Sequence, residues 1–170
     1  MKKLSIPLLA FLTATASALY IVENLLMSAL PVPFLRIGLA NVVMLYLVYN
    51  RYILAAFVVT IAKSIIGGIA TFSLLSPTLP LSLGGGIAAV IVMSLGLLVR
   101  PRFSIFGISI LGALAHNGMQ LCLARLLIIR SPSLFVLTPI LIFLALFSGV
   151  ITAYLCIYIE EKYIAQKAEI

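Results

Sequence analysis

The chain consists of long apolar runs separated by short breaks that contain charges, prolines or both. The breaks are the segments ALPVPF, YNRY, SPTLP, RPR and RSPS, whose residues are typical of turns and helix ends. The runs lack the strict alternation of apolar and polar positions that a half-buried strand would need. We therefore predict helices joined by very short loops, over six runs: about 5–28, 35–50, 52–75, 81–99, 103–129 and 134–159.

The composition places these helices in a membrane. Of 170 residues, 64% are hydrophobic and 9% are charged, and the mean hydropathy is +1.31. Too little polar surface remains to cover a soluble core. Crossing a hydrocarbon layer of about 30 Å takes about 20 apolar residues, so there is room for about six spans and little else. We predict an all-α polytopic membrane protein with six transmembrane helices, in which residues 1–170 form a single integral membrane domain.

The basic residues indicate the orientation, because Lys and Arg concentrate in the short cytoplasmic loops of membrane proteins. With the N-terminus inside, seven fall on the inner side: Lys2, Lys3, Arg51, Arg100, Arg102, Lys162 and Lys167. Three fall on or near the outer side: Arg36, Arg125 and Arg130. We predict that both termini are cytoplasmic in a multi-pass protein of the cell membrane. The net charge of +7 follows from this topology, so we expect the lipid bilayer and no nucleic acid as a partner.

The N-terminal stretch MKKLSIPLLAFLTATASA has a second interpretation, because a basic start, an apolar stretch and small residues also describe a secretory signal. Its apolar run continues beyond Ala18 to Val22, which favours a membrane span. Cleavage would lower the intact mass by about 1.5–2 kDa. As a span, the stretch carries alanines at four-residue spacing, on which another helix can pack closely: Ala10, Ala14 and Ala18.

Polar residues inside the runs are costly in lipid and usually face the protein interior or a water-filled cavity. In the segment AHNGMQ the polar positions are three and four residues apart, so they share one helix face. Glycines in the third and fourth runs would let backbones or a ligand approach closely. We predict a pocket in the outer half, formed by Arg36, Asn41, Lys63, His116, Asn117 and Gln120. Further lining residues are Glu23, Gly67, Gly84, Gly85, Gly86 and Arg125.

Each of these features also has a purely structural interpretation. Asn117 and Gln120 could join helices by hydrogen bonds, the glycines could serve packing, and Arg125 could extend to the interface. Lys63 is harder to explain in this way, because an ammonium in mid-span needs a partner such as Glu23 or an anionic ligand. Cys122 and Cys156 have no metal-ligand spacing, so we expect small core residues, with no disulfide, metal or cofactor.

Three segments carry a resemblance to a known family: PVPFLRIGLANVVML (31–45), SLGGGIAAVIVMSL (82–95) and FSIFGISILGALAHNGMQL (103–121). They resemble the membrane family called heptaprenyl diphosphate synthase component I, also called Gx transporter proteins. The resemblance extends from about Ala18 to Ile159. The position of Arg36 is commonly lysine in that family, which keeps the charge and changes its geometry.

The two family names imply different functions. Prenyl diphosphate synthases bind diphosphate through magnesium held by aspartate-rich motifs, because hard cations require oxygen ligands. This chain has no aspartate. Of its four acids, Glu23 lies in the first run, and the other three lie near the C-terminus: Glu160, Glu161 and Glu169. A self-sufficient synthase is therefore disfavoured, and we expect no enzyme and no catalytic residue. The alternative is a membrane accessory or anchoring subunit of isoprenoid synthesis.

The transporter name implies a similarity to the substrate-binding (S) components of energy-coupling factor transporters. Such a subunit captures a small solute and docks, here through Ala10, Ala14 and Ala18, on a transmembrane coupling subunit driven by two ATPase subunits. The chain has no G-x-x-x-x-G-K-[ST] loop, so another chain must handle ATP. We predict a substrate-binding subunit for uptake of a small anionic solute. A stand-alone carrier or scaffold stays open, although the two halves show no convincing inverted repeat.

Overall fold

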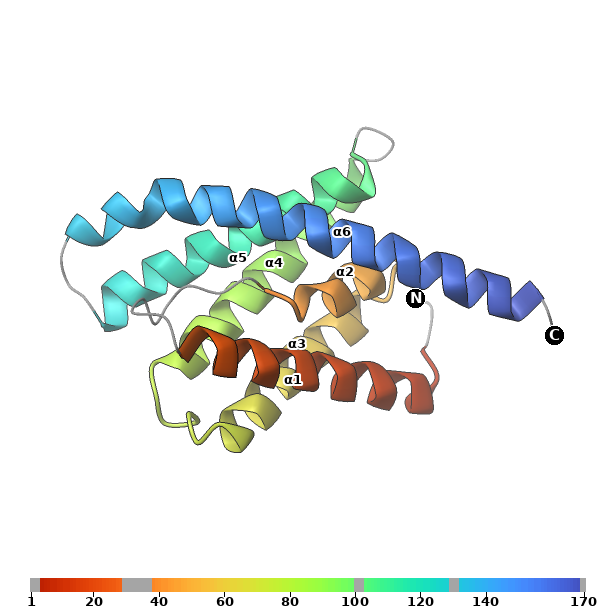
Figure 1. The fold of residues 1–170 in the computed structure, drawn as a ribbon, viewed down its shortest axis with the longest axis horizontal. Helices are drawn as coiled ribbons and strands as arrows, with labels where there is room; N and C mark the ends of the chain where they lie inside the picture. Colours follow the sequence, from red (N-terminus) through yellow and green to blue (C-terminus); the bar gives the residue numbers. More distant parts are fainter. Residues whose placement is uncertain (1–3, 29–37, 100–102, 129–131, 169–170) are drawn as a thin grey trace.

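The computed structural model describes residues 4–28, 38–99, 103–128 and 132–168. Within these ranges it contains helices and turns and no strand, which confirms the all-α prediction. The helices form one elongated bundle (Figure 1). In chain order they are α1 (Ile6–Ser28), α2 (Asn41–Tyr49), α3 (Ile53–Ala70), α4 (Thr78–Leu98), α5 (Ile105–Leu127), the 3-10 helix η1 (Pro132–Leu137) and α6 (Thr138–Ala168).

Five helices are long and apolar enough to cross a membrane: α1, α3, α4, α5 and α6. The exception is α2, whose nine residues rise about 14 Å, about half the thickness of the hydrocarbon layer. The prediction of six spanning helices is therefore too high by one for the described part of the chain. The apolar run was misleading because seven of the nine α2 residues are buried in protein, and burial in protein selects the same side chains as lipid does.

Several helix boundaries differ from the prediction. The sixth run was expected to end at residue 159, but α6 extends to Ala168. Two further differences have local reasons. The third run was expected to be helical to residue 75, but α3 ends at Ala70. Phe72 has a positive φ of 53°, which turns the chain out of the helix. The fourth helix was expected to begin after Pro80, but it begins at Thr78. Pro80 lies in the first turn, where a missing N–H breaks no helical hydrogen bond.

The pairing of helices fixes their directions. Gly67 and Thr71 of α3 lie against Tyr20 and Asn24 of α1, and the Asn24 amide donates to the Thr71 hydroxyl over 3.2 Å. The residue numbers at these contacts increase in the same direction along both helices, so α1 and α3 run parallel. The chain must therefore return through the bundle between them, in the segment that contains α2. The start of α1 and the end of α6 lie at the same end of the bundle (Figure 1).

The core surrounds α2. This helix contacts each of the other α-helices, and Met44, Leu45 and Leu47 are fully buried. At the end of α2, the Asn50 amide donates to the Glu160 carboxylate of α6 over 2.7 Å. By contrast, α1 lies at the edge of the bundle and packs only on α3 and α2 among the described elements. Large apolar side chains cover the outer surface of the long helices, as a lipid-facing surface requires.

Candidate functional site

The start of α2 is held inside the bundle by a carboxylate of α1. Gly38, with a positive φ of 80°, and Leu39 precede the helix, and both backbone N–H groups donate to the buried Glu23 side chain, Leu39 over 3.1 Å. Helix N-termini leave N–H groups without intrahelical partners and attract negative charge. Glu23 therefore fixes the beginning of a half-length helix, and since α2 ends beside Glu160 at the bundle end, this beginning lies near mid-depth.

Sequence reasoning expected Glu23 near the pocket but missed this role. The signal that could have indicated it is the GLAN segment, since a glycine before a short apolar run is typical of a chain that starts a helix from a strained turn. What no pattern reveals is that the carboxylate of a preceding helix reaches that turn.

Lys63 of α3 is inside the protein, with 2% of its surface exposed. Its ammonium nitrogen lies 5.7 Å from the centroid of the Tyr20 ring on α1, within the range of a cation–π interaction. Tyr20 is also the side chain that covers Gly67, one turn beyond Lys63 on α3. The mid-span lysine is therefore held between α3 and α1, one helical turn along α1 from Glu23.

His116, Asn117 and Gln120 are buried on one face of α5, as their spacing predicted. The Asn117 amide donates to the backbone carbonyl of Leu141 in α6 over 3.2 Å. A second bond joins the same two helices, because the Ser109 hydroxyl donates to the Gly149 carbonyl over 2.7 Å. Asn117 therefore joins helices, in agreement with the structural interpretation of this residue.

Gln120 differs from its neighbour Asn117. It is 2% exposed, and neither its amide nitrogen nor its oxygen has a hydrogen-bond partner within the described residues. A Cβ atom on Gly85 would lie 3.0 Å from the Gln120 Cγ and 3.1 Å from the His116 ring, so α4 approaches both side chains closely. The oxygen of the buried Asn41 amide is in the same condition as the Gln120 amide. Buried polar groups normally have partners, so these amides mark a place where a ligand or water belongs.

The other predicted glycines lie against protein side chains. Gly67 is covered by Tyr20, Gly84 by Leu123, and a Cβ on Gly86 would lie 2.6 Å from the Thr60 methyl group. Close helix packing accounts for these three positions. Gly85 is the glycine that borders the polar face of α5.

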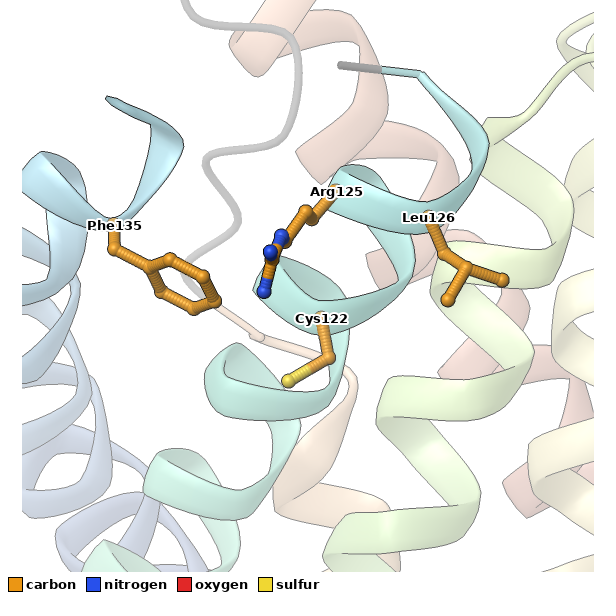
Figure 2. Close-up of a pocket in the computed structure, with 4 residues that line it drawn as sticks. All are labelled: Cys122, Arg125, Leu126 and Phe135. Carbon is orange, nitrogen blue, oxygen red and sulfur yellow. The ribbon is translucent and has the colours of Figure 1, made fainter. Parts of the chain in front are cut away.

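Two predicted cations are not brought to this cluster. Arg36 lies outside the described residues. Arg125 is five positions from Gln120, about 140° around α5, so it lies on a different face of the helix. There its guanidinium lies 5.0 Å from the centroid of the Phe135 ring, beside a pocket of about 600 Å³ (Figure 2).

The cysteines differ from the expectation in one respect. Both are free, and Cys156 is buried as expected. Cys122 is exposed and lines the pocket beside Arg125. The prediction of a core position for Cys122 is therefore wrong. The residue lies on the outer face of α5, and an apolar residue in a membrane helix can face either the core or the lipid.

The alanines at four-residue spacing are exposed along α1: Ala10, Ala14 and Ala18. The opposite side of α1 carries its buried residues, among them Ala16 and Tyr20, which face the bundle. The stripe therefore faces away from the described helices.

Comparison with known families gives one match, to the model of heptaprenyl diphosphate synthase component I, over residues 12–159. The chain belongs to this family. No curated protein and no solved structure matches the chain. The resemblance expected from the sequence is confirmed, and the chain is a polytopic membrane member of the heptaprenyl diphosphate synthase component I family.

The family match covers the whole buried polar cluster, from Glu23 on α1 to Gln120 on α5. It begins after Ala10, so the match includes Ala14 and Ala18 of the exposed stripe and leaves Ala10 outside. In this heptaprenyl diphosphate synthase component I protein, the matched range therefore contains the buried cluster and most of the stripe.

Proposed function

We propose that this protein is a membrane substrate-binding subunit that takes up a small anionic solute, energised by a separate ATPase module. The observation that carries the proposal is the Gln120 amide, fully buried in an apolar bundle without a hydrogen-bond partner among the described residues. Leaving such a group unsatisfied costs about 1–3 kcal/mol, so its presence is readily explained by a ligand that it contacts. Asn41 offers a second acceptor, and Lys63 and His116 are further polar groups of the buried core.

The charge balance favours an anionic solute. From Asn24 to Ile159 the sequence contains no acidic residue, whereas Lys63 and Arg36 are cationic positions of the predicted pocket. The Glu23 carboxylate accepts hydrogen bonds from two backbone N–H groups and is thereby committed to the start of α2. A carboxylate or phosphate group on the solute would balance the remaining positive charge.

The exposed alanine stripe supports a partner in the membrane. Small residues allow two helices to approach closely, and the stripe faces away from the bundle on a helix that packs only on α3 and α2. In the proposed complex a transmembrane coupling subunit packs here and two ATPase subunits drive it. The present chain contributes binding and no catalysis, with both termini on the cytoplasmic side of the cell membrane.

Native mass spectrometry of the protein, extracted mildly from its own membrane, tests the proposal. We expect a complex with a transmembrane subunit and two ATPases that carries a small anion. Lys63→Gln should lose the anion, and Lys162→Gln, the same change on the exposed end of α6, should keep it. Retention of the anion by both variants, or a complex without ATPases, would contradict the proposal.

A second function is favoured by the family description itself. The chain could be a non-catalytic accessory or anchoring subunit in heptaprenyl diphosphate synthesis, with the magnesium and diphosphate chemistry supplied by a partner that has the acidic residues this sequence lacks. The same experiment separates the two functions. Recovery of a prenyl diphosphate synthase and of no ATPase would support the accessory role.

A further inference from the structure

A second site candidate lies at the opposite face of α5. The pocket of about 600 Å³ is lined by residues from α5 and η1, namely Cys122, Arg125, Leu126 and Phe135. Figure 2 shows the Arg125 side chain extending from α5 across the pocket toward the Phe135 ring, with Cys122 beneath it. The pocket therefore combines one cation, one thiol and two apolar side chains.

The position of Arg125 leaves its hydrogen-bond donors available. Its only interaction in the described part of the chain is with the Phe135 ring, 5.0 Å from the guanidinium carbon to the ring centroid. The ring offers no conventional hydrogen-bond acceptor, so the guanidinium N–H groups have no acceptor among the described residues. They form a planar fork of donors that fits an oxyanion.

The described part of the chain has no acid beside Arg125. No acidic residue occurs between Asn24 and Ile159 in the sequence. Glu23 is buried and accepts from the backbone at the start of α2, and Glu160 is bonded to Asn50 at the other end of the bundle. The acids that the structure describes therefore give this cation no partner, and an anion from outside the chain can supply one.

We propose that this pocket binds an oxyanion group, a phosphate or carboxylate, carried by an amphiphilic molecule. The oxyanion pairs with the Arg125 fork, and the apolar part lies against Leu126 and Phe135. Two sources offer this chemistry, the headgroup of an anionic lipid and a soluble amphiphilic anion. This inference goes beyond the proposed function, because it depends neither on the buried Gln120 amide nor on an ATPase partner.

Cys122 provides a reporter of the site. It is exposed and lines the pocket, whereas Cys156 is fully buried, so the native chain contains both a reporter and an internal control for folding. The full-length protein is placed in phosphatidylcholine nanodiscs and alkylated with a neutral maleimide, with and without hexyl phosphate. At about ten times its dissociation constant the probe fills about nine tenths of the sites, so alkylation of Cys122 should slow about tenfold.

Nanodiscs that contain phosphatidylglycerol distinguish the two sources. Slowing by hexyl phosphate in phosphatidylcholine identifies a site for a soluble anion, and slowing only in phosphatidylglycerol identifies a lipid headgroup site. Either result supports an oxyanion site if Arg125→Gln abolishes the slowing and Arg51→Gln, a matched change at the opposite end of the bundle, preserves it.

The proposal is overturned if neither medium protects Cys122, or if Arg125→Gln protects it as well as the native chain. Reactivity of Cys156 reveals a variant that has lost its fold. If Arg125→Gln loses its fold, Arg125→Met is used instead, because an unbranched apolar side chain suits the membrane better while still removing the charge. Loss of protection in Arg125→Met supports the proposal, and protection equal to that of the native chain overturns it.

Discussion

At the scale of single residues, two neighbouring amides on α5 have different roles. Asn117 donates to the Leu141 carbonyl, whereas the Gln120 amide is buried without a partner in the described residues. The sequence predicted that both would face the interior, because their spacing puts them on one helix face. It could not separate them, because the deciding partner is a backbone carbonyl of another helix, which has no sequence signature.

Replacing these two amides should have opposite effects on stability. Gln120→Leu removes an unsatisfied group, so we expect an unchanged or higher melting temperature in detergent. Asn117→Leu loses the bond to α6 and should lower the free energy of unfolding by about 1 kcal/mol. Thermal unfolding of the two variants beside the native protein measures both effects. An equal loss of stability in both variants would mean that Gln120 has a protein partner after all.

At the scale of helices, the sequence predicted the long apolar elements and misjudged α2. Runs for α1, α4 and α5 agree with the structure to within a few residues, because a membrane span imposes a long uninterrupted apolar stretch. The second run produced only α2, since its length is set by the Glu23 carboxylate and the turn at Gly38. Such a contact between helices depends on the folded arrangement and produces no recognisable pattern of apolar and polar residues in the sequence.

The link between Glu23 and the start of α2 can be tested by removing its charge. Glu23→Gln keeps the shape but replaces one acceptor oxygen by a donor, so one backbone N–H loses its partner. We expect a loss of about 1–3 kcal/mol and faster hydrogen exchange in residues 38–49. Glu161→Gln, on the exposed end of α6, is the matched control and should change neither. Unchanged exchange over 38–49 in Glu23→Gln would contradict the capping role.

The α1–α3 contact should be equally sensitive to one added methyl group. Gly67→Ala would place a Cβ against the Tyr20 ring and force α1 away from α3, so we expect a loss of about 1–3 kcal/mol. Gly118→Ala is the control, because nothing lies within 4 Å of its Cβ position and alanine favours a helix by about 1 kcal/mol. Thermal unfolding of the two variants gives the comparison. Equal stability would show that α1 does not pack on α3 through this glycine.

At the scale of the whole molecule, the parallel pair α1 and α3 explains why the first and last helices share one end of the bundle, although α2 is only half as long as a membrane span. The chain returns between these helices through the segment of α2, so the start of α1 and the end of α6 share one end of the bundle (Figure 1). Arg51 and Lys162 belong to that end, and Arg125 belongs to the other. The sequence predicted that Arg51 and Lys162 would share one end and Arg125 would lie near the other, because the helix count assigns each loop to a side of the membrane. The spacing of five residues between Gln120 and Arg125 already indicated different faces of α5. What the sequence could not predict is that Arg125 lies beside Phe135 of η1, because that contact depends on the folded arrangement.

Sidedness is the last prediction, and it follows from the charges at the two ends. Leu75 is fully exposed between α3 and α4 and lies at the same end of the bundle as Arg125. Phe103, at the start of α5, lies at the same end of the bundle as Arg51. In a chain with Cys122→Ala and Cys156→Ala, a membrane-impermeant maleimide should label Leu75→Cys in intact cells. Phe103→Cys should react only after permeabilisation, because the basic end faces the cytoplasm.

The opposite labelling pattern would have a specific consequence. It would turn the Arg125 pocket and the polar cluster toward the cytoplasm, where a subunit for uptake could not capture its solute. The accessory role would gain from that result, because a membrane subunit that presents a cationic pocket to the cytoplasm can meet a soluble partner or a phosphorylated product there. Sidedness therefore discriminates between the two functions without knowledge of the solute.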